Sequence, residues 1–326
     1  MKKLLLFLVL IGSSFSLLAQ QTTVTWPFDG QTRKYIQYVP SIYDGNEAVP
    51  LVIALHGLGD NINNFQGVGF QLVADTANFI VVYPEAIVEP LFTQATAWNS
   101  GAGVAGFSLN ADIDDVGFIN ALIDTVSAHY NIDQNRVYAT GFSMGGFMSN
   151  RLACELNNRI AAIASVAGTI GGVLTCNPGT EIPVCHIHGT DDTNVGYGTP
   201  EGAQDNTFGN NVADWIAFWT ANNGCGSITL EGQFPNTEND GYIVDYVEYG
   251  GCTNSTRVVH YKVHGADHIW LPDNQNGNDI FYVFEIWKFF LGVSPSNLVP
   301  ASISDSDIAS IEVYPNPTSD YLRLEN

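Results

Sequence analysis

The stretch Arg136-Val137-Tyr138-Ala139-Thr140-Gly141-Phe142-Ser143-Met144-Gly145-Gly146 decides the fold of this chain. Its first five residues form the short, largely apolar run of a buried strand, and the residues from Met144 onward have the period of a helix. The glycines between them permit a tight, strained turn. Such a strand–turn–helix lifts a serine hydroxyl above the edge of a sheet, where it can act as a nucleophile. The stretch therefore predicts an α/β sheet with Ser143 at its functional edge.

Strand and helix patterns alternate on both sides of this stretch. Residues 34–39 alternate like an antiparallel strand, and later apolar runs are continuous, as in strands that are buried on both faces. The alternation predicts a mainly parallel central sheet with helices on both faces, whose functional loops follow the carboxyl ends of the strands. The expected buried strands are 51–55, 79–83, 136–140, 160–167, 182–187 and 258–263, and the expected helices are 65–77, 116–126, 144–156, 212–221 and 280–291.

Three further motifs follow expected strands. His56-Gly57-Leu58-Gly59 comes after the first buried strand. An attacked ester carbonyl develops negative charge, which preorganised backbone N–H groups stabilise. One such donor follows the nucleophile and the other comes from an earlier loop, so we expect Met144 and Leu58 in these positions. The Asp114-Asp115 pair precedes a helix, and its expected role is capping or an internal salt bridge.

The motif His188-Gly189-Thr190-Asp191-Asp192-Thr193-Asn194-Val195 follows the 182–187 strand. An acid at this place can orient a catalytic histidine, and the neighbouring aspartates leave open which of the two does so. The rival interpretation is a metal site that uses His186, His188 and an aspartate, because the two histidines would share one face of a strand.

The last motif, Gly265-Ala266-Asp267-His268-Ile269-Trp270-Leu271-Pro272, supplies the histidine. The order serine, acid, histidine is that of the α/β-hydrolases. His264 competes with His268 for the role of base.

Together these motifs resemble the polyhydroxybutyrate-depolymerase-like esterases of the α/β-hydrolase fold, which include feruloyl and acetylxylan esterases of carbohydrate esterase family 1. The resemblance runs from about Lys34 to Leu291 and includes Trp98-Asn99, residues 114–118, 130–138 and 151–155. The register of its His-Gly-Thr-x-Asp pattern makes Asp192 the triad acid, and the resemblance favours His268 as the base. Val195-Gly196-Tyr197 and Ala266-Asp267 depart from the family pattern at the rim of the site.

The resemblance implies a serine carboxylic-ester hydrolase of the α/β-hydrolase fold that needs neither cofactor nor metal. The implied triad is Ser143, Asp192 and His268, with Leu58 and Met144 forming the oxyanion hole. The expected partner is an oligomeric or polymeric ester, either a polyester or a polysaccharide carrying feruloyl or acetyl groups. The alternatives are a serine peptidase of the same fold and a non-catalytic secreted binding module.

Aromatic residues beside the motifs are expected to form a substrate surface, because exposed rings give a large contact area. They are Trp98, Tyr197 and Trp270. Ordinary core packing is the alternative for each.

The chain has five cysteines, so at least one lacks a partner within the chain. The resemblance implies a disulfide between Cys225 and Cys252. Cys154 can pair with Cys176, and Cys185 is expected to be a buried free thiol.

The composition excludes some partners. The 326 residues carry 33 acidic and 11 basic side chains, a net charge of −22. This charge argues against binding to nucleic acid or to an anionic membrane surface. The hydrophobic content of 45% is too high for a disordered chain.

The two ends predict export. Lys2-Lys3 and the short apolar run that follows are typical of a signal peptide over residues 1–20, and the run is too short to span a bilayer. Residues 21–292 would form the catalytic domain and 293–310 a linker. Residues 311–326, with Tyr314-Pro315-Asn316-Pro317-Thr318, resemble the start of a type 9 secretion sorting domain. We expect a secreted protein that contacts export machinery through this segment, with no membrane insertion.

Overall fold

The computed structural model describes residues 19–90, 94–104, 107–271 and 278–299. The predicted signal peptide, apart from its last two residues, and the predicted sorting segment lie outside these residues. Within them, no helix has both the length and the apolar character needed to cross a membrane.

The centre of the molecule is a ten-stranded sheet in the order β1-β2-β4-β3-β9-β10-β11-β14-β13-β12. The pairs from β4 to β14 are parallel, and the strands at both ends pair in antiparallel fashion. This is the α/β-hydrolase arrangement that the sequence predicts. The strands are β1 Gln20–Phe28, β2 Gln31–Val39, β3 Val49–Leu55, β4 Ile80–Pro84, β9 Ile132–Phe142, β10 Ala162–Val166, β11 Val184–Gly189, β12 Ile228–Gln233, β13 Ile243–Tyr249 and β14 Val258–His264.

Two small hairpins lie outside the sheet, where β5 pairs with β6 and β7 with β8. Their strands are β5 Ile87–Val88, β6 Thr96–Ala97, β7 Gly103–Val104 and β8 Phe107–Ser108. The helices are α1 Ile62–Phe65, η1 Gln66–Val68, α2 Phe70–Ala77, α3 Asp115–His129, α4 Met144–Glu155, α5 Val212–Asn222, η2 Thr253–Ser255 and α6 Tyr282–Phe290.

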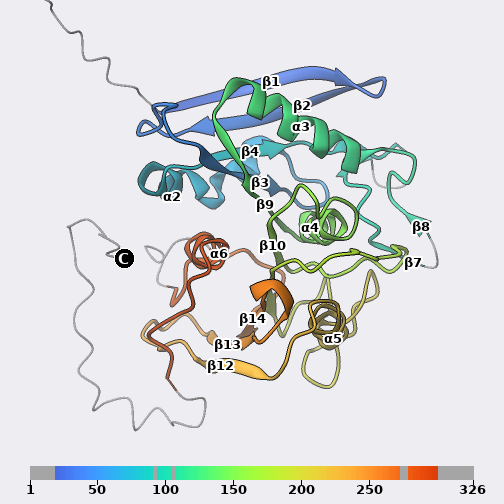
Figure 1. The fold of residues 1–326 in the computed structure, drawn as a ribbon. Coiled ribbons are helices and arrows are strands. Elements are labelled where there is room, and N and C mark those ends of the chain that lie inside the picture. The colour runs from blue at the N-terminus through green and yellow to red at the C-terminus, as the bar shows by residue number, and fades with distance from the viewer. Residues whose placement is uncertain (1–18, 91–93, 105–106, 272–277, 300–326) are drawn as a thin grey trace, which may run out of the picture.

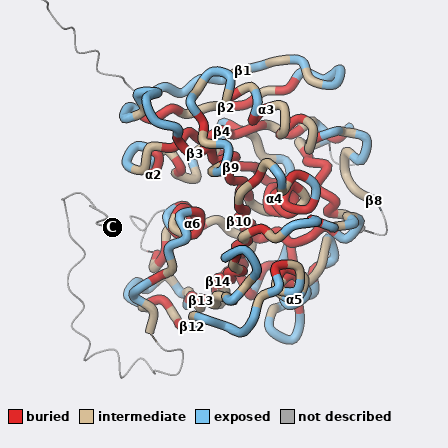
Figure 2. Tube along the Cα trace, viewed as in Figure 1, coloured by how far each residue is buried: buried red, intermediate tan, exposed pale blue. Residues whose placement is uncertain are grey.

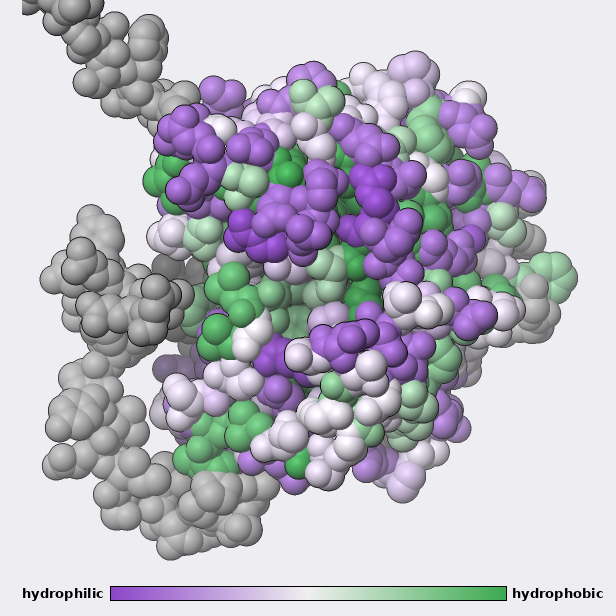
Figure 3. Space-filling view, viewed as in Figure 1, coloured by the Kyte–Doolittle hydropathy of each residue, from purple (hydrophilic) through white to green (hydrophobic). Residues whose placement is uncertain are grey.

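Helices cover both faces of the sheet, and each face has its own hydrophobic core. Helices α3, α4 and α5 pack on one face, while α2 and α6 pack on the other. The middle strands are buried and the outer strands β1 and β12 are largely exposed (Figure 2). On the face drawn in Figure 3, hydrophilic side chains dominate over β1, β2 and α3, and hydrophobic ones show in a band across the middle.

The expected strands and helices are present, but the structure differs from the expectation in several places. The expected helix at 65–77 is interrupted at Gly69, whose φ of 105° lies in the left-handed region. The antiparallel strands β1, β12 and β13 were not expected, because the polar, glycine-rich sequence around β12 and β13 lacks clear alternation. Within the expected linker of residues 293–310, Val299 pairs with Gln233 at the end of β12.

Two disulfides fasten peripheral segments. Cys225 is bonded to Cys252, as the resemblance implied, and Cys154 is bonded to Cys176. Cys185 on β11 is a buried free thiol, as expected, and burial raises its pKa.

Candidate active site

The turn between β9 and α4 holds Ser143 in a strained conformation. Its φ of 55° and ψ of −120° are unfavourable for a residue with a side chain. Hydrogen bonds keep it there: the Ser143 N–H donates to the Val166 carbonyl on β10 at 2.8 Å, and the Ser143 carbonyl accepts from Phe147 N–H at 3.0 Å. A Cβ on Gly141 or Gly145 would overlap backbone atoms, so the close approach of strand and helix requires both glycines.

The loop after β3 brings Leu58 beside this turn, because Gly57 lies against Ser143 and the backbone of Phe142. Buried His56 fixes the loop. Its Nε2 accepts from Ala86 N–H at 3.1 Å, so its Nδ1 carries the proton donated to the Gly57 carbonyl at 2.7 Å. Burial lowers the pKa of His56, which keeps the ring neutral. Leu58 itself is exposed at the rim.

Trp98 is a buried side chain that supports this loop through hydrogen bonds. Its side chain is fully buried, its indole N–H donates to the His56 carbonyl at 2.9 Å, and its backbone N–H contacts Met144 Sδ at 3.2 Å. The prediction that Trp98 belongs to an exposed aromatic surface is therefore wrong. The residue instead connects the two segments that carry the predicted oxyanion donors, Leu58 and Met144.

The loop after β11 buries Asp192 completely. Its Oδ1 accepts from the backbone N–H groups of Asn194 at 2.9 Å and Val195 at 2.7 Å, and its Oδ2 lies 2.7 Å from His268 Nδ1. Burial acts to raise the pKa of Asp192, but hydrogen bonds from His188 and His268 outweigh it and hold that pKa below the usual range. Asp192 is therefore an anion at neutral pH.

Asp191 occupies a different environment from its neighbour. Its carboxylate accepts from the Thr190 hydroxyl at 2.9 Å, and its backbone N–H donates to the Ala266 carbonyl at 3.0 Å. This backbone bond joins the Asp192 loop to the loop that carries His268. Of the two aspartates, only Asp192 has its carboxylate against His268, which agrees with the register of the resemblance.

His268 lies over the serine turn. Its ring packs on Phe142, the residue before Ser143, with ring centroids 4.7 Å apart. Its backbone N–H donates to Asp267 Oδ1 at 2.8 Å, and the same oxygen accepts from Thr193 N–H at 2.8 Å. The competitor His264 instead contacts Asp245 on β13 at 2.6 Å. The structure thus brings His268, rather than His264, to Asp192 and the Ser143 turn.

The rival metal site at His186 and His188 is not supported. His186 Nδ1 contacts the Ser165 hydroxyl at 2.8 Å, and its Nε2 lies 2.9 Å from His188 Nδ1. Both rings are buried and already hydrogen-bonded. Among the described residues, no group of three His, Cys, Asp or Glu side chains is placed to hold a metal ion.

Comparison with known proteins now assigns the chain to a family. Residues 41–208 match the family model described as Phospholipase/Carboxylesterase. The chain belongs to this family. It is therefore a hydrolase of carboxylesterase type.

The similar proteins are esterases and a depolymerase. Feruloyl esterase D of Neurospora crassa is 30% identical over 82% of this chain and 84% of its own length. A bifunctional acetylxylan esterase/xylanase of Neocallimastix patriciarum is 28% identical over 82% of this chain and 35% of its own length. Poly(3-hydroxyalkanoate) depolymerase C of Paucimonas lemoignei is 28% identical over 61% of this chain and 46% of its own length.

A solved structure supports the fold. The feruloyl esterase module from Clostridium thermocellum, complexed with sinapinate, superposes with a TM-score of 0.54 at 14% identity, covering 84% of this chain and 88% of that one.

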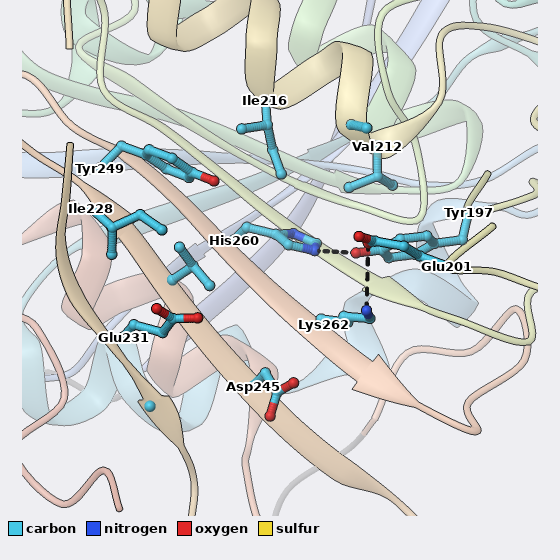
Figure 4. A pocket seen from close by; sticks show the side chains of 13 residues that line it. Tyr197, Glu201, Val212, Ile216, Ile228, Glu231, Asp245, Tyr249, His260 and Lys262 are labelled. Atoms are coloured by element: carbon cyan, nitrogen blue, oxygen red, sulfur yellow. Dashed lines mark hydrogen bonds and ion pairs between the residues drawn. The ribbon is translucent and has the colours of Figure 1, made fainter. Parts of the chain in front are cut away.

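The other two predicted substrate residues of this carboxylesterase-family chain have different surroundings. Tyr197 is buried and its hydroxyl contacts His260 Nε2 at 2.8 Å, so it is not part of an exposed aromatic surface. It forms part of the wall of a pocket of about 400 Å³ between α5 and strands β12–β14, and none of the predicted catalytic residues lines this pocket (Figure 4). Trp270 is partly buried, and its ring packs edge-on against Phe142 with ring centroids 6.3 Å apart.

Sequence reasoning did not connect a buried ion pair to this site. Arg33 Nη2 lies 2.6 Å from Asp115 Oδ1, and Asp115 Oδ2 accepts from the backbone N–H of Asn99 at 2.7 Å. Asp114 caps α3 through Gly117 N–H at 2.8 Å, so the expected capping and salt-bridge roles are both confirmed. Through Asn99, the ion pair fixes the chain directly after Trp98.

Proposed function

We propose that this carboxylesterase-family protein hydrolyses esters through an acyl-enzyme formed on Ser143. The observation that carries the proposal is the contact of His268 Nδ1 with the buried, ionised carboxylate of Asp192. The same His268 ring packs against Phe142, the residue before Ser143. The strained turn at Ser143 supports it further, because strain of this kind collects where a nucleophile must stand clear of the backbone.

In this proposal His268 accepts the proton of the Ser143 hydroxyl as its oxygen attacks the ester carbonyl. The Asp192 carboxylate accepts a hydrogen bond from Nδ1–H, which leaves Nε2 free to act as the base and stabilises the imidazolium that forms. The backbone N–H groups of Leu58 and Met144 stabilise the oxyanion, and His268 returns its proton to the departing alcohol. Water then releases the acyl group by the same steps.

The proposed substrates are feruloyl or acetyl esters carried on a polysaccharide. Support comes from the feruloyl and acetylxylan esterases among the similar proteins, two of which align with 82% of this chain. A polyester is the second candidate, since the depolymerase of Paucimonas lemoignei is also similar.

We further propose that the protein works outside the cell. Its two disulfides support this, because such bonds persist in oxidising compartments. The division into a leader over 1–20, a catalytic domain over 21–292, a linker over 293–310 and a type 9 sorting segment over 311–326 is part of the same proposal, with residues up to Val299 contacting the catalytic domain.

The test compares rates on methyl ferulate and on a short 3-hydroxybutyrate oligomer, with Ser143→Ala as the blank. We expect turnover of the ferulate to exceed that of the oligomer and to disappear in Ser143→Ala. Activity that survives in Ser143→Ala would contradict the mechanism. A preference for the oligomer would overturn the proposed substrate class but leave the mechanism intact.

A further inference from the structure

A chain of buried side chains extends from the proposed triad into the sheet. It begins at Ser165 on β10 and passes through His186 and His188 on β11 to Asp192, with contacts of 2.8, 2.9 and 3.2 Å. All four side chains are at most 1% exposed. His188 Nε2 also lies 2.8 Å from the carbonyl of Val195. None of the first three residues takes part in the proposed reaction, so their hydrogen bonds need another explanation.

The position of one proton follows from the partners. His188 Nε2 faces the Val195 carbonyl and the ionised carboxylate of Asp192, and neither can donate a hydrogen bond. This nitrogen therefore carries a proton whatever the charge of the ring. If His188 is neutral, its Nδ1 accepts from His186 Nε2–H, and His186 Nδ1 accepts from the Ser165 hydroxyl.

If His188 is charged, the chain reverses. Its Nδ1–H then donates to His186 Nε2, His186 Nδ1–H donates to the Ser165 oxygen, and the Ser165 hydroxyl turns to the Cys185 carbonyl at 3.4 Å. Both arrangements satisfy every member of the chain. In both arrangements the Nε2–H of His188 points at Asp192. A residue of strand β11 therefore donates a hydrogen bond to this carboxylate in either charge state.

The donor acts on the oxygen that also faces His268. Asp192 Oδ2 lies 2.7 Å from His268 Nδ1 and 3.2 Å from His188 Nε2, whereas Oδ1 is held by the backbone of Asn194 and Val195. Negative charge beside an imidazole favours the protonated form of the ring, and a protonated ring cannot act as a base. A second donor at this oxygen takes up part of that charge.

We propose that His188 is a positioning residue that keeps His268 in its neutral, proton-accepting form, by sharing the charge of Asp192. This inference rests on the proposed function, because it assigns His268 the role of base. It predicts that loss of the His188 N–H moves the acid limb of the kcat/KM profile to higher pH. The loss of activity should then be largest at acidic pH and small on the alkaline plateau.

The other titratable groups around His188 and Asp192 stay neutral or have hydrogen-bond or ion-pair partners of their own. Burial lowers the pKa of His260 to about 3, so it stays neutral, and burial likewise lowers that of His186. The remaining charged groups near the pair are Asp267, which accepts from Thr193 and His268, Asp191, which accepts from Thr190, and the ion pair of Lys262 with Glu201 behind Tyr197. Neither His188 variant described below changes any of these groups.

The test uses three variants of the full chain and a small soluble ester. His188→Leu keeps a bulky apolar side chain but has no donor, and His188→Gln places an amide N–H near the position of Nε2. His260→Gln is the matched control, because His260 is an equally buried histidine on the neighbouring strand that hydrogen-bonds to Tyr197 and the His186 carbonyl instead of Asp192.

In His188→Leu we expect the midpoint of the acid limb of the kcat/KM profile to move to higher pH by about half to one pH unit. At a pH below this midpoint, kcat/KM should then be about three- to tenfold lower than in the wild type. Its plateau should stay within about threefold of the wild type. His188→Gln and His260→Gln should keep the wild-type limb. An unmoved or lowered limb in His188→Leu, or an equal shift in His188→Gln, would overturn the inference.

A spectroscopic measurement on the wild type covers the case in which His188→Leu fails to fold. Nitrogen-15 NMR of the histidine rings, assigned by the signals lost in His188→Gln, should show a protonated Nε2 at His188 across the pH range in which the protein is folded. An unprotonated Nε2 would overturn the inference. If the wild type hydrolyses no ester, or Ser143→Ala remains active, the proposed function fails instead, and the NMR result still reports on the contact itself.

Discussion

Replacing Trp98 with phenylalanine removes one hydrogen bond from the base of the predicted oxyanion loop and leaves a ring in the core. The indole N–H that donates to the His56 carbonyl lies in a fully buried environment. Leaving that carbonyl without a partner costs about 1–3 kcal/mol, and the smaller ring adds a void. We therefore expect the free energy of unfolding to fall by about 2–4 kcal/mol, measured by denaturant titration.

The catalytic effect follows from the position of the loop. Loss of one oxyanion donor typically costs about 2.7–4 kcal/mol of barrier. Trp98→Phe displaces the Leu58 N–H without deleting it and leaves Met144 in place, so we expect a smaller loss, about ten- to fiftyfold in kcat. Because the oxyanion forms with every ester, the loss should be equal on p-nitrophenyl acetate and on methyl ferulate, with KM little changed.

Trp219→Phe is the matched control for this experiment. Trp219 on α5 is also fully buried, and its indole N–H donates at 3.2 Å to Asn150, which lies on α4 two turns beyond Ser143 and contacts neither predicted oxyanion donor through this bond. It should lose comparable stability but little kcat. A rise in KM for methyl ferulate alone, with p-nitrophenyl acetate unaffected, would refute the reasoning and return Trp98 to the role of a substrate contact.

Four further predictions concern the activity and the pH-dependent stability set by Asp192, the turn at Gly145 and the ion pair of Arg33. Asp192→Asn should lower kcat by about 10⁴-fold and Asp191→Asn by less than about tenfold, measured on one ester. Because folding lowers the pKa of Asp192, this carboxylate contributes stability above its unfolded pKa, and the contribution is lost as the pH falls. Between about pH 5 and about pH 3, the free energy of unfolding of the wild type should therefore fall more than that of Asp192→Asn, as measured by denaturant titration. Gly145→Ala should abolish activity, because its Cβ would overlap the Leu55 and His56 carbonyls; a fully active variant would show that the turn can relax. Arg33→Leu should lower the free energy of unfolding by about 3–5 kcal/mol, and adding Asp115→Asn should recover part of that loss.

Much of the fold was accessible from the sequence because its signals are local. A continuous apolar run such as residues 51–55 identifies a buried strand without knowledge of its neighbours, and the glycines around Ser143 encode a tight turn by the absence of side chains. The strands β1, β12 and β13 escaped prediction. Strands β1 and β12 form the two edges of the sheet and pair with one neighbour each, whereas β13 lies between β12 and β14. Exposed positions near the edges of the sheet tolerate polar residues that weaken the pattern.

The sequence by itself therefore determined the parallel sheet and the turn that holds Ser143, and the resemblance added the prediction of Asp192, rather than its neighbour, as the partner of His268. Only the tertiary structure decided that Trp98 is buried and supports the loop after β3, that His188 contacts Asp192, and that Asp115 forms an ion pair with Arg33. The physical reason is that a side chain's exposure and partners are set by strands and loops that folding brings together from distant parts of the chain. An aromatic or histidine residue beside a motif has the same local sequence whether it faces solvent or the core.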